Sequence, residues 1–304
     1  MTICTRLDPK RTLGWCTGKS IEEPTSDCFK KANIHPHYPH PRSCIGTFND
    51  LPGFAHCIRI KASQMPQQVR AGNVVAGITG LDQVIDAGLL DSVSIIASLA
   101  YSKATNGGTR GVLFCRKEDA YSLDELRKMR GNRIISEYQE VMKKFVAMNN
   151  IEAEVVPCTG GAEAYVASGQ YPLGAALAET GTSLRINDLV EVATIFESQT
   201  VLIANTAMYA ELDVRESVDF LARLLAGVIE ARDKRYLTMN VHKEKVDGIV
   251  TILPSSESPN LQRLANGNFA VSSVVPLKGL AALKLRLIKS GATDIVELDA
   301  HSII

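Results

Sequence analysis

The sequence predicts an α/β fold in which a two-lobed body is followed by a small C-terminal domain. Up to residue 232, short apolar runs bounded by turn residues alternate with longer helical patterns, which is typical of mostly parallel sheets. From residue 233 the order becomes β-α-β-β-α-β within about 70 residues, which is the ferredoxin-like signature of many ligand-sensing modules. The chain has 304 residues, 45% of them hydrophobic, so two or three separately packed units are expected.

The first lobe is expected to span residues 1–117 and 198–232. Strands are predicted at 13–16, 54–60, 74–79 and 112–115, and helices at 21–32, 66–71 and 81–87. The apolar run 200–204 brings the chain back to this lobe. A helix over 214–231 then closes the body, because its apolar residues recur at spacings of three and four: Val218, Leu221, Leu224, Leu225 and Val228.

The second lobe is expected to span residues 118–197. Strands are predicted at 133–135, 152–156, 174–178 and 191–197, with helices at 137–148 and 162–167. The C-terminal domain, residues 233–304, is expected to be ferredoxin-like (ACT-like) and regulatory. Its strands are predicted at 236–241, 269–275 and 294–298, and its helices at 243–253 and 279–290.

Composition argues against a nucleic-acid-binding protein and against a membrane protein. Lys plus Arg and Asp plus Glu each total 33, so no net charge favours a nucleic-acid partner. Polar residues interrupt the longest apolar stretch, 192–210, and the N-terminus carries Asp8 and Lys10 where a signal peptide would be apolar. We therefore expect a cytoplasmic protein with no membrane partner. The seven cysteines include no CxxC pair and are expected to be reduced thiols.

Three histidines, His35, His37 and His40, fall close together in a proline-rich segment. The prolines impose an extended path and no carboxylate flanks the segment, so a solvated loop is favoured over a metal site. No residue of the chain is assigned as a metal ligand or as a catalytic acid, base or nucleophile.

The sharpest local pattern is the strand 174–178 followed by the turn Glu179-Thr180-Gly181-Thr182-Ser183-Leu184. Backbone N–H groups, hydroxyls and the positive end of a helix can converge there on one phosphate. A helix cap without a ligand explains the pattern equally well. Gly160-Gly161 and Gly77-Ile78-Thr79-Gly80 are similar strand-end turns, and ligands of open α/β sheets bind at the carboxyl ends of strands.

The ordered set of motifs resembles the ATP phosphoribosyltransferase family, which catalyses the first step of histidine biosynthesis. The resemblance runs from residue 13 to residue 304. In the body it rests on Gly77-Ile78-Thr79-Gly80, Thr109-Arg110, Arg133-Ile134-Ile135-Ser136-Glu137-Tyr138, Gly160-Gly161-Ala162-Glu163 and Glu179-Thr180-Gly181-Thr182-Ser183-Leu184. In the C-terminal domain it rests on Ile252-Leu253-Pro254, Phe269-Ala270-Val271 and Lys289-Ser290-Gly291-Ala292-Thr293-Asp294-Ile295.

The resemblance implies transfer of the phosphoribosyl group of phosphoribosyl pyrophosphate (PRPP) to N1 of ATP, with Mg²⁺ on the pyrophosphate that is released. It assigns the 5′-phosphate of PRPP to the turn Glu179 to Leu184. The remaining phosphates or the nucleotide are assigned to Lys19, Thr79, Gly80, Arg110, Ser136, Tyr138, Gly161 and Glu163. It also implies a histidine-like effector at the C-terminal domain and a homo-oligomer, either a hexamer or a dimer.

The chain departs from the family pattern at three acidic positions, where Gln64, Val75 and Ala176 stand, and Lys19 replaces an arginine. A carboxylate on a ribose diol or on magnesium makes a charge-assisted bond of about 1.5–3 kcal/mol, which these side chains cannot replace. Two other functions therefore stay open. One is a diverged phosphoribosyltransferase with another acceptor or donor. The other is a non-catalytic ligand sensor, because a two-lobed body is also periplasmic-binding-protein-like.

Overall fold

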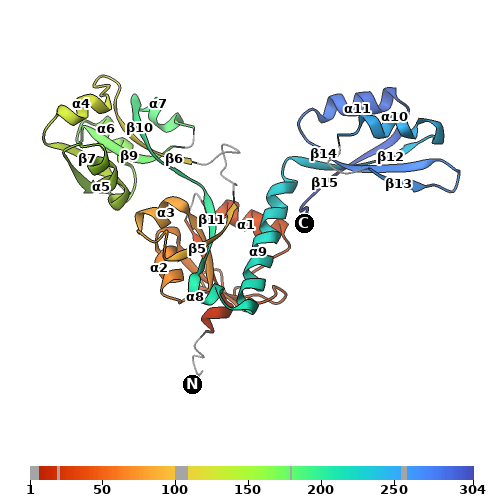
Figure 1. The fold of residues 1–304 in the computed structure, drawn as a ribbon, viewed down its shortest axis with the longest axis horizontal. Coiled ribbons are helices and arrows are strands. Elements are labelled where there is room, and N and C mark those ends of the chain that lie inside the picture. The colour runs from red at the N-terminus through yellow and green to blue at the C-terminus, as the bar shows by residue number, and fades with distance from the viewer. Residues whose placement is uncertain (1–6, 19–20, 100–108, 179, 255–258) are drawn as a thin grey trace. The chain divides into compact units, whose positions relative to one another are not determined.

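The structure is a computed structural model that describes residues 7–18, 21–99, 109–178, 180–254 and 259–304. The chain divides into two compact units, Met1–Ala222 and Arg223–Ile304, and the division falls within the long helix α9 (Leu212–Ala231). The described residues form three sheets (Figure 1). The predicted α/β fold class is confirmed: two mixed sheets with helices form the body, and a four-stranded antiparallel sheet forms the C-terminal unit.

The sheet of the first lobe has six strands in the order β2-β3-β1-β4-β11-β5. β1 pairs in parallel with β3 and with β4, whereas β11 runs antiparallel between β4 and β5. The strands are β1 (Thr12–Thr17), β2 (Ile45–Thr47), β3 (His56–Lys61), β4 (Ala76–Gly80), β5 (Val93–Leu99) and β11 (Thr200–Asn205). The helices are η1 (Pro9–Arg11), α1 (Glu22–Lys31), η2 (Ala62–Gln64), α2 (Met65–Arg70), α3 (Leu81–Asp86) and α8 (Thr206–Tyr209).

The central strands β1 and β4 are nearly continuous apolar runs because both of their faces are covered. Helix α2 (predicted at 66–71) begins at Met65 and ends at Arg70, one residue earlier at each end. Pro66 is tolerated in the first turn, and Gly72 follows the helix with a left-handed φ of 72°.

The sheet of the second lobe has five strands in the order β10-β6-β9-β7-β8, in which β7 is parallel to β8 and to β9. The strands are β6 (Thr109–Arg116), β7 (Asn132–Ser136), β8 (Ala153–Pro157), β9 (Leu173–Ala178) and β10 (Leu189–Ser198). The helices are α4 (Leu123–Lys128), α5 (Gln139–Met148), α6 (Ala162–Ala167) and α7 (Thr182–Ile186). Two apolar clusters, one built around Phe114 and the other around Met142, fill the lobe.

β6 differs from the lobe limits expected from the sequence, which place residues 112–115 in the first lobe. In the structure β6 pairs along its length with β10 and with β9, so it belongs to the second sheet. Strand pairing of this kind depends on residues far away in the chain, and the local pattern of residues 109–116 carries no sign of it.

The C-terminal unit contains an antiparallel sheet in the order β13-β14-β12-β15, with helices α10 and α11 on one face (Figure 1). Its elements are β12 (Lys234–Val241), η3 (Lys243–Lys245), α10 (Val246–Ile252), β13 (Asn260–Arg263), β14 (Phe269–Pro276), α11 (Leu280–Lys289) and β15 (Ala292–Asp299). This is the expected β-α-β-β-α-β order. In the ranges that the structure describes, no helix is long and apolar enough to cross a membrane.

Candidate active site

The candidate site lies where parallel strands end. In the first lobe β1, β3 and β4 end at Thr17, Lys61 and Gly80. In the second lobe β7 and β8 end at Ser136 and Pro157, and β9 ends at Ala178, shortly before the turn 180–183. Because the carboxyl ends of parallel strands meet at one edge of a sheet, the residues that follow them are brought together.

A pocket of about 510 Å³ opens between these strand ends, a volume within the range of small-molecule sites. Both lobes contribute to it. Its lining residues are Thr17, Gly18, Lys61, Ala62, Ser63, Gln83, Glu137, Cys158 and Thr159. Lys61 brings a cation from the first lobe and Glu137 brings a carboxylate from the second, so the pocket has polar groups of both signs.

Two titratable groups in the pocket are shifted by their surroundings. Partial burial raises the pKa of the Glu137 carboxyl above its ordinary value, and the nearby carboxylates of Glu163 and Asp82 raise it further. Burial likewise raises the pKa of the Cys158 thiol, which makes the thiolate scarcer than in a free cysteine. Glu137 is therefore a carboxyl that binds a proton more readily than usual, and Cys158 is not an activated nucleophile.

The turn before α7 is ordered by its own hydroxyls. Gly181 has a left-handed φ of 66° and precedes the first residue of α7, and the hydroxyls of Thr180 and Thr182 lie 2.8 Å apart. Ser183 Oγ donates to the Glu163 carboxylate at 3.4 Å, which links the turn to the start of α6 beside the pocket. Leu184 is buried in the apolar cluster of the second lobe. Glu179 lies outside the described residues.

Arg110 is bound by a carboxylate close to the same turn. Its guanidinium makes two contacts with Glu191, at 3.0 and 3.1 Å, and a third with the hydroxyl of Thr194 at 3.2 Å. Glu191 approaches Gly181 closely, because its Oε1 would be 3.4 Å from a Cβ atom at that glycine. A ligand phosphate at this turn would thus compete with Glu191 for Arg110.

Four further candidate residues are engaged within the protein. The buried Thr79 hydroxyl donates to the carbonyl oxygen of Ala62 at 2.8 Å. Gly80 cannot carry a side chain without a shift of its neighbours, because a Cβ atom there would lie 2.1 Å from Asp82 Oδ1. The buried Ser136 Oγ accepts the backbone N–H of Tyr138 at 2.9 Å, and the Tyr138 ring is itself buried. None of the four is among the described residues that line the pocket.

Gly161 precedes α6 with a left-handed φ of 71° and places Glu163 in the first turn of that helix. Lys19 lies outside the described residues, next to the pocket-lining Gly18. Four residues that line the pocket were not predicted as ligand-binding residues: Lys61, Ser63, Gln83 and Cys158. The sequence feature that could have identified them is their position: each closely follows a predicted strand or lies in the first turn of a helix that follows a strand.

The three replaced acidic positions lie in different surroundings. Val75 is fully buried at the opposite end of β4, where its N–H and C=O bond to Thr12 and Asn205. At about 3.3 Å per residue it is about 13 Å along the strand from Thr79. Gln64 is exposed next to Ser63, and Ala176 lies 8% exposed in an apolar cluster.

In the described part of the chain no group of three or more His, Cys, Asp or Glu side chains is placed to hold a metal ion. The histidines of the proline-rich segment, His35, His37 and His40, are exposed there. His40 Nδ1 accepts the backbone N–H of Arg42 at 3.1 Å.

Comparison with known proteins finds similarity over nearly the whole chain. Residues 61–227 match the family described as HisG, ATP phosphoribosyltransferase, and residues 231–302 match the HisG C-terminal domain. The ATP phosphoribosyltransferase of Desulforudis audaxviator is 31% identical over 296 residues, which are 97% of this chain and 99% of the relative. That of Chlorobium phaeobacteroides is 32% identical over 286 residues, covering 94% and 95% of the two chains.

Among solved structures, the ATP phosphoribosyl transferase (HisG:HisZ) complex from Thermotoga maritima has a chain with a similar fold. The TM-score is 0.59 at 20% identity, and the match covers 72% of this chain and 98% of that one.

Proposed function

Because this chain belongs to the ATP phosphoribosyltransferase family and has its activity, the first step of histidine biosynthesis, we propose that PRPP and ATP bind at the strand ends described above. The observation that carries this proposal is that strands of both lobes end at the same pocket and at the turn beside it. Six parallel strands, three in each lobe, end where the pocket and the turn 180–183 lie. Ligands of open α/β sheets bind at such edges.

The reaction requires a site that holds one phosphate, neutralises a leaving pyrophosphate and places the adenine N1 behind the anomeric carbon. Positioning and electrostatics supply most of such catalysis. We assign the 5′-phosphate to the turn Thr180 to Ser183, where two hydroxyls and the backbone after Gly181 are available. Lys61 is the described cation that lines the pocket, and it would bind the pyrophosphate.

Mg²⁺ fits this arrangement as an ion carried by the substrate. Magnesium in phosphate-transfer sites is often held by one or two carboxylates together with substrate phosphates, and the pocket offers the Glu137 carboxylate. When bound there it would neutralise charge on the pyrophosphate. The raised pKa of Glu137 means that this ligand is lost as the pH falls toward the acid range.

Pyrophosphate release from PRPP, with ATP compared with other nucleotides and bases, tests the assignment. We expect release with ATP, a loss of about 100-fold in kcat/KM for Lys61→Ala, and no detectable PRPP binding by Gly181→Val, since valine is strained at a left-handed φ. Arg130→Ala is the matched control, because Arg130 pairs with Glu152 on the surface. Release only with another acceptor would favour a diverged phosphoribosyltransferase, and ligand binding without release would favour a sensor.

We further propose that the C-terminal unit mediates self-association and binds a histidine-like effector, and that the protein acts in the cytoplasm. Support for self-association comes from the sheet face opposite α10 and α11. Tyr236 pairs there with Val274 and with Leu298, and Thr238 pairs with Val296. Val274, Val296 and Leu298 are each more than one third exposed. A hexamer or dimer that covers this face would be disrupted by Val296→Glu, as measured by analytical ultracentrifugation.

A further inference from the structure

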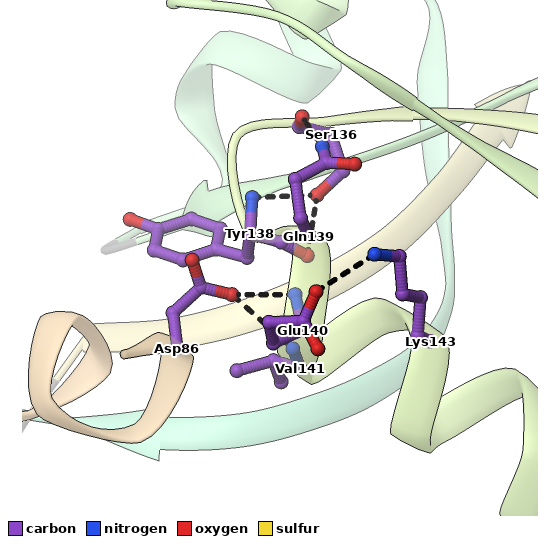
Figure 2. Close-up of polar contacts among 7 residues, drawn as sticks. All are labelled: Asp86, Ser136, Tyr138, Gln139, Glu140, Val141 and Lys143. Carbon is purple, nitrogen blue, oxygen red and sulfur yellow. Dashed lines mark hydrogen bonds and ion pairs between the residues drawn. The ribbon is translucent and has the colours of Figure 1, made fainter. Parts of the chain in front are cut away.

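Helix α5 of the second lobe is capped by a residue of the first lobe. The side chain at its own N-cap, Tyr138, makes no capping hydrogen bond. Instead Asp86 Oδ1 accepts the backbone N–H groups of Glu140 at 2.9 Å and Val141 at 3.2 Å, as Figure 2 shows. The first turn of a helix leaves such N–H groups without partners inside the helix. Two of them are satisfied here by an element of the other lobe.

The charge of Asp86 suits α5 and does not suit the helix that carries it. Asp86 is the last residue of α3, where the negative end of a helix disfavours a carboxylate. At α5 the same carboxylate faces the positive end of a ten-residue helix and can be stabilised by it. The placement of an acid at this position is therefore explained by the contact between the lobes.

Helix α3 is also fixed at its other end. The Asp82 carboxylate accepts a hydrogen bond of 2.6 Å from Ser198 Oγ, at the point where the chain leaves β10 to return to the first lobe. Gln83, which lines the pocket, lies three residues before Asp86 and so on the same side of the helix. The short helix α3 thus contacts the end of β10, contributes a residue to the wall of the pocket and caps the start of α5.

The segment between β7 and α5 carries Glu137 into the pocket. Ser136 Oγ holds the Tyr138 N–H, and the buried Tyr138 ring packs edge-on against Phe196 with centroids 5.3 Å apart. Farther along the chain, the backbone N–H groups of Glu140 and Val141 donate to Asp86. Glu137 therefore sits on a segment whose position relative to Lys61 and Gln83 depends on the Asp86 contact.

We propose that Asp86 is a positioning residue that holds the two lobes in the arrangement in which Glu137 faces Lys61 and Gln83 across the pocket. The proposal rests on the proposed function in one respect: PRPP and ATP must bind in that pocket. Loss of the contact would leave each lobe folded and would lower the fraction of molecules with an assembled pocket, which lowers apparent affinity in proportion.

Three variants test this proposal by steady-state kinetics and by amide hydrogen exchange. Asp86→Ala removes the acceptor. Asp86→Asn keeps an acceptor, because asparagine caps helices about as well as aspartate. Asp91→Ala is the control, since it removes an exposed acid of the same lobe. For Asp86→Ala we expect KM for PRPP and ATP to rise about 3- to 30-fold with little change in kcat. Exchange at Glu140 and Val141 should accelerate, while the thermal midpoint changes little. Asp86→Asn and Asp91→Ala should resemble the unmodified chain.

The exchange measurement requires no substrate, so it tests the contact even if PRPP and ATP bind elsewhere. Unchanged exchange at Glu140 and Val141 in Asp86→Ala would overturn the proposal, as would a uniform acceleration across both lobes with unchanged KM. An Asp86→Asn variant that matches Asp86→Ala would overturn the role of the acceptor. If Asp86→Ala does not fold, Asp86→Ser replaces it: its hydroxyl is too short to reach both N–H groups, so the same changes in KM and in exchange are expected, at a smaller size.

Discussion

At the scale of single residues, Ala176 is the position where the chain departs most tellingly from the family pattern. It is 8% exposed and belongs to an apolar cluster with Phe114, Ile135 and Leu184. A carboxylate there would have no partner in this cluster. The absence of the family aspartate is therefore consistent with the packing that this lobe has adopted.

Ala176→Asp should lower the free energy of unfolding by about 2–3 kcal/mol at pH 7, because it buries an unpaired charge. Burial would raise the pKa of the new carboxyl above its unfolded value, so the loss is complete above the folded pKa and shrinks as the pH falls through it. Urea unfolding at pH 7 and pH 5 measures the difference. Leu177→Asp is the control, since Leu177 faces the opposite side of β9 and is 37% exposed. A gain in PRPP-dependent turnover for Ala176→Asp would contradict this account.

The candidate residues show what a sequence can and cannot assign. The order of strand-end turns pointed to the edge where the pocket lies, because residues after parallel strands meet whatever their identity. It could not tell that the hydroxyls of Thr79 and Ser136 are used inside the protein, or that Arg110 is paired with Glu191. The partner of Thr79 lies 17 residues away in the sequence, and the partner of Arg110 lies 81 residues away. Lys61 was not predicted as a site residue, although its place at the end of β3 makes it a pocket residue.

At the scale of elements, Asn205 joins two helices to the first sheet. Its side-chain oxygen accepts the Met208 N–H at 3.0 Å and caps α8, while its amide nitrogen donates to the carbonyls of Val69 and Arg70 at the end of α2. The backbone N–H of Asn205 bonds to Val75. One buried side chain therefore satisfies a helix start and a helix end together.

Asn205→Ala should lower the free energy of unfolding by about 2–4 kcal/mol, the sum of a lost cap and of buried carbonyls left without donors. Asn205→Ser should recover only part of this loss, because serine can cap α8 but is too short to reach both carbonyls of α2. Urea unfolding of the three proteins gives the ranking. Equal stability of the Ser and Ala variants would show that the cap contributes nothing.

Elements with clear local signals were predicted well, and the others depend on tertiary structure. Helix α2, with Pro66 in its first turn and Gly72 after its C-cap, lies within one residue of its predicted limits. β13 was not predicted, because its four residues are all exposed and show no burial pattern. β5 was not predicted either; in the described sheet it pairs with β11, about 100 residues later in the chain. The ferredoxin-like order was expected correctly even though β13 itself was not located.

At the scale of the whole molecule, helix α9 contributes to both compact units and receives the last residues of the chain. Ile303 N–H donates to the carbonyl of Gly227 at 2.9 Å. A Cβ atom on Gly227 would lie 2.7 Å from Ser302 Oγ and 2.8 Å from the carbonyl oxygen of Ile303. The glycine therefore provides the space in which residues 302–304 lie against the helix.

Gly227→Ala should have opposite effects on stability in two backgrounds. In the full chain it displaces residues 302–304 and lowers the free energy of unfolding. In a chain that ends at His301 the same change should raise it by about 0.5–1 kcal/mol, because alanine favours a helix over glycine. Urea unfolding of the four proteins measures both signs. The same sign in both backgrounds would contradict the role given to this contact.

The place of β11 has a consequence for synthesis on the ribosome. All five strands of the second sheet lie in the continuous stretch 109–198, so that lobe can fold as soon as this stretch has emerged. The first sheet must wait, since β4 and β5 pair through β11. At roughly 5–20 residues per second, the interval between Leu99 and Thr200 lasts roughly 5–20 s. During that time β5, with its apolar Ile95 and Ile96, lacks the strand with which it pairs, and the lobe that is translated first is the last to complete its sheet.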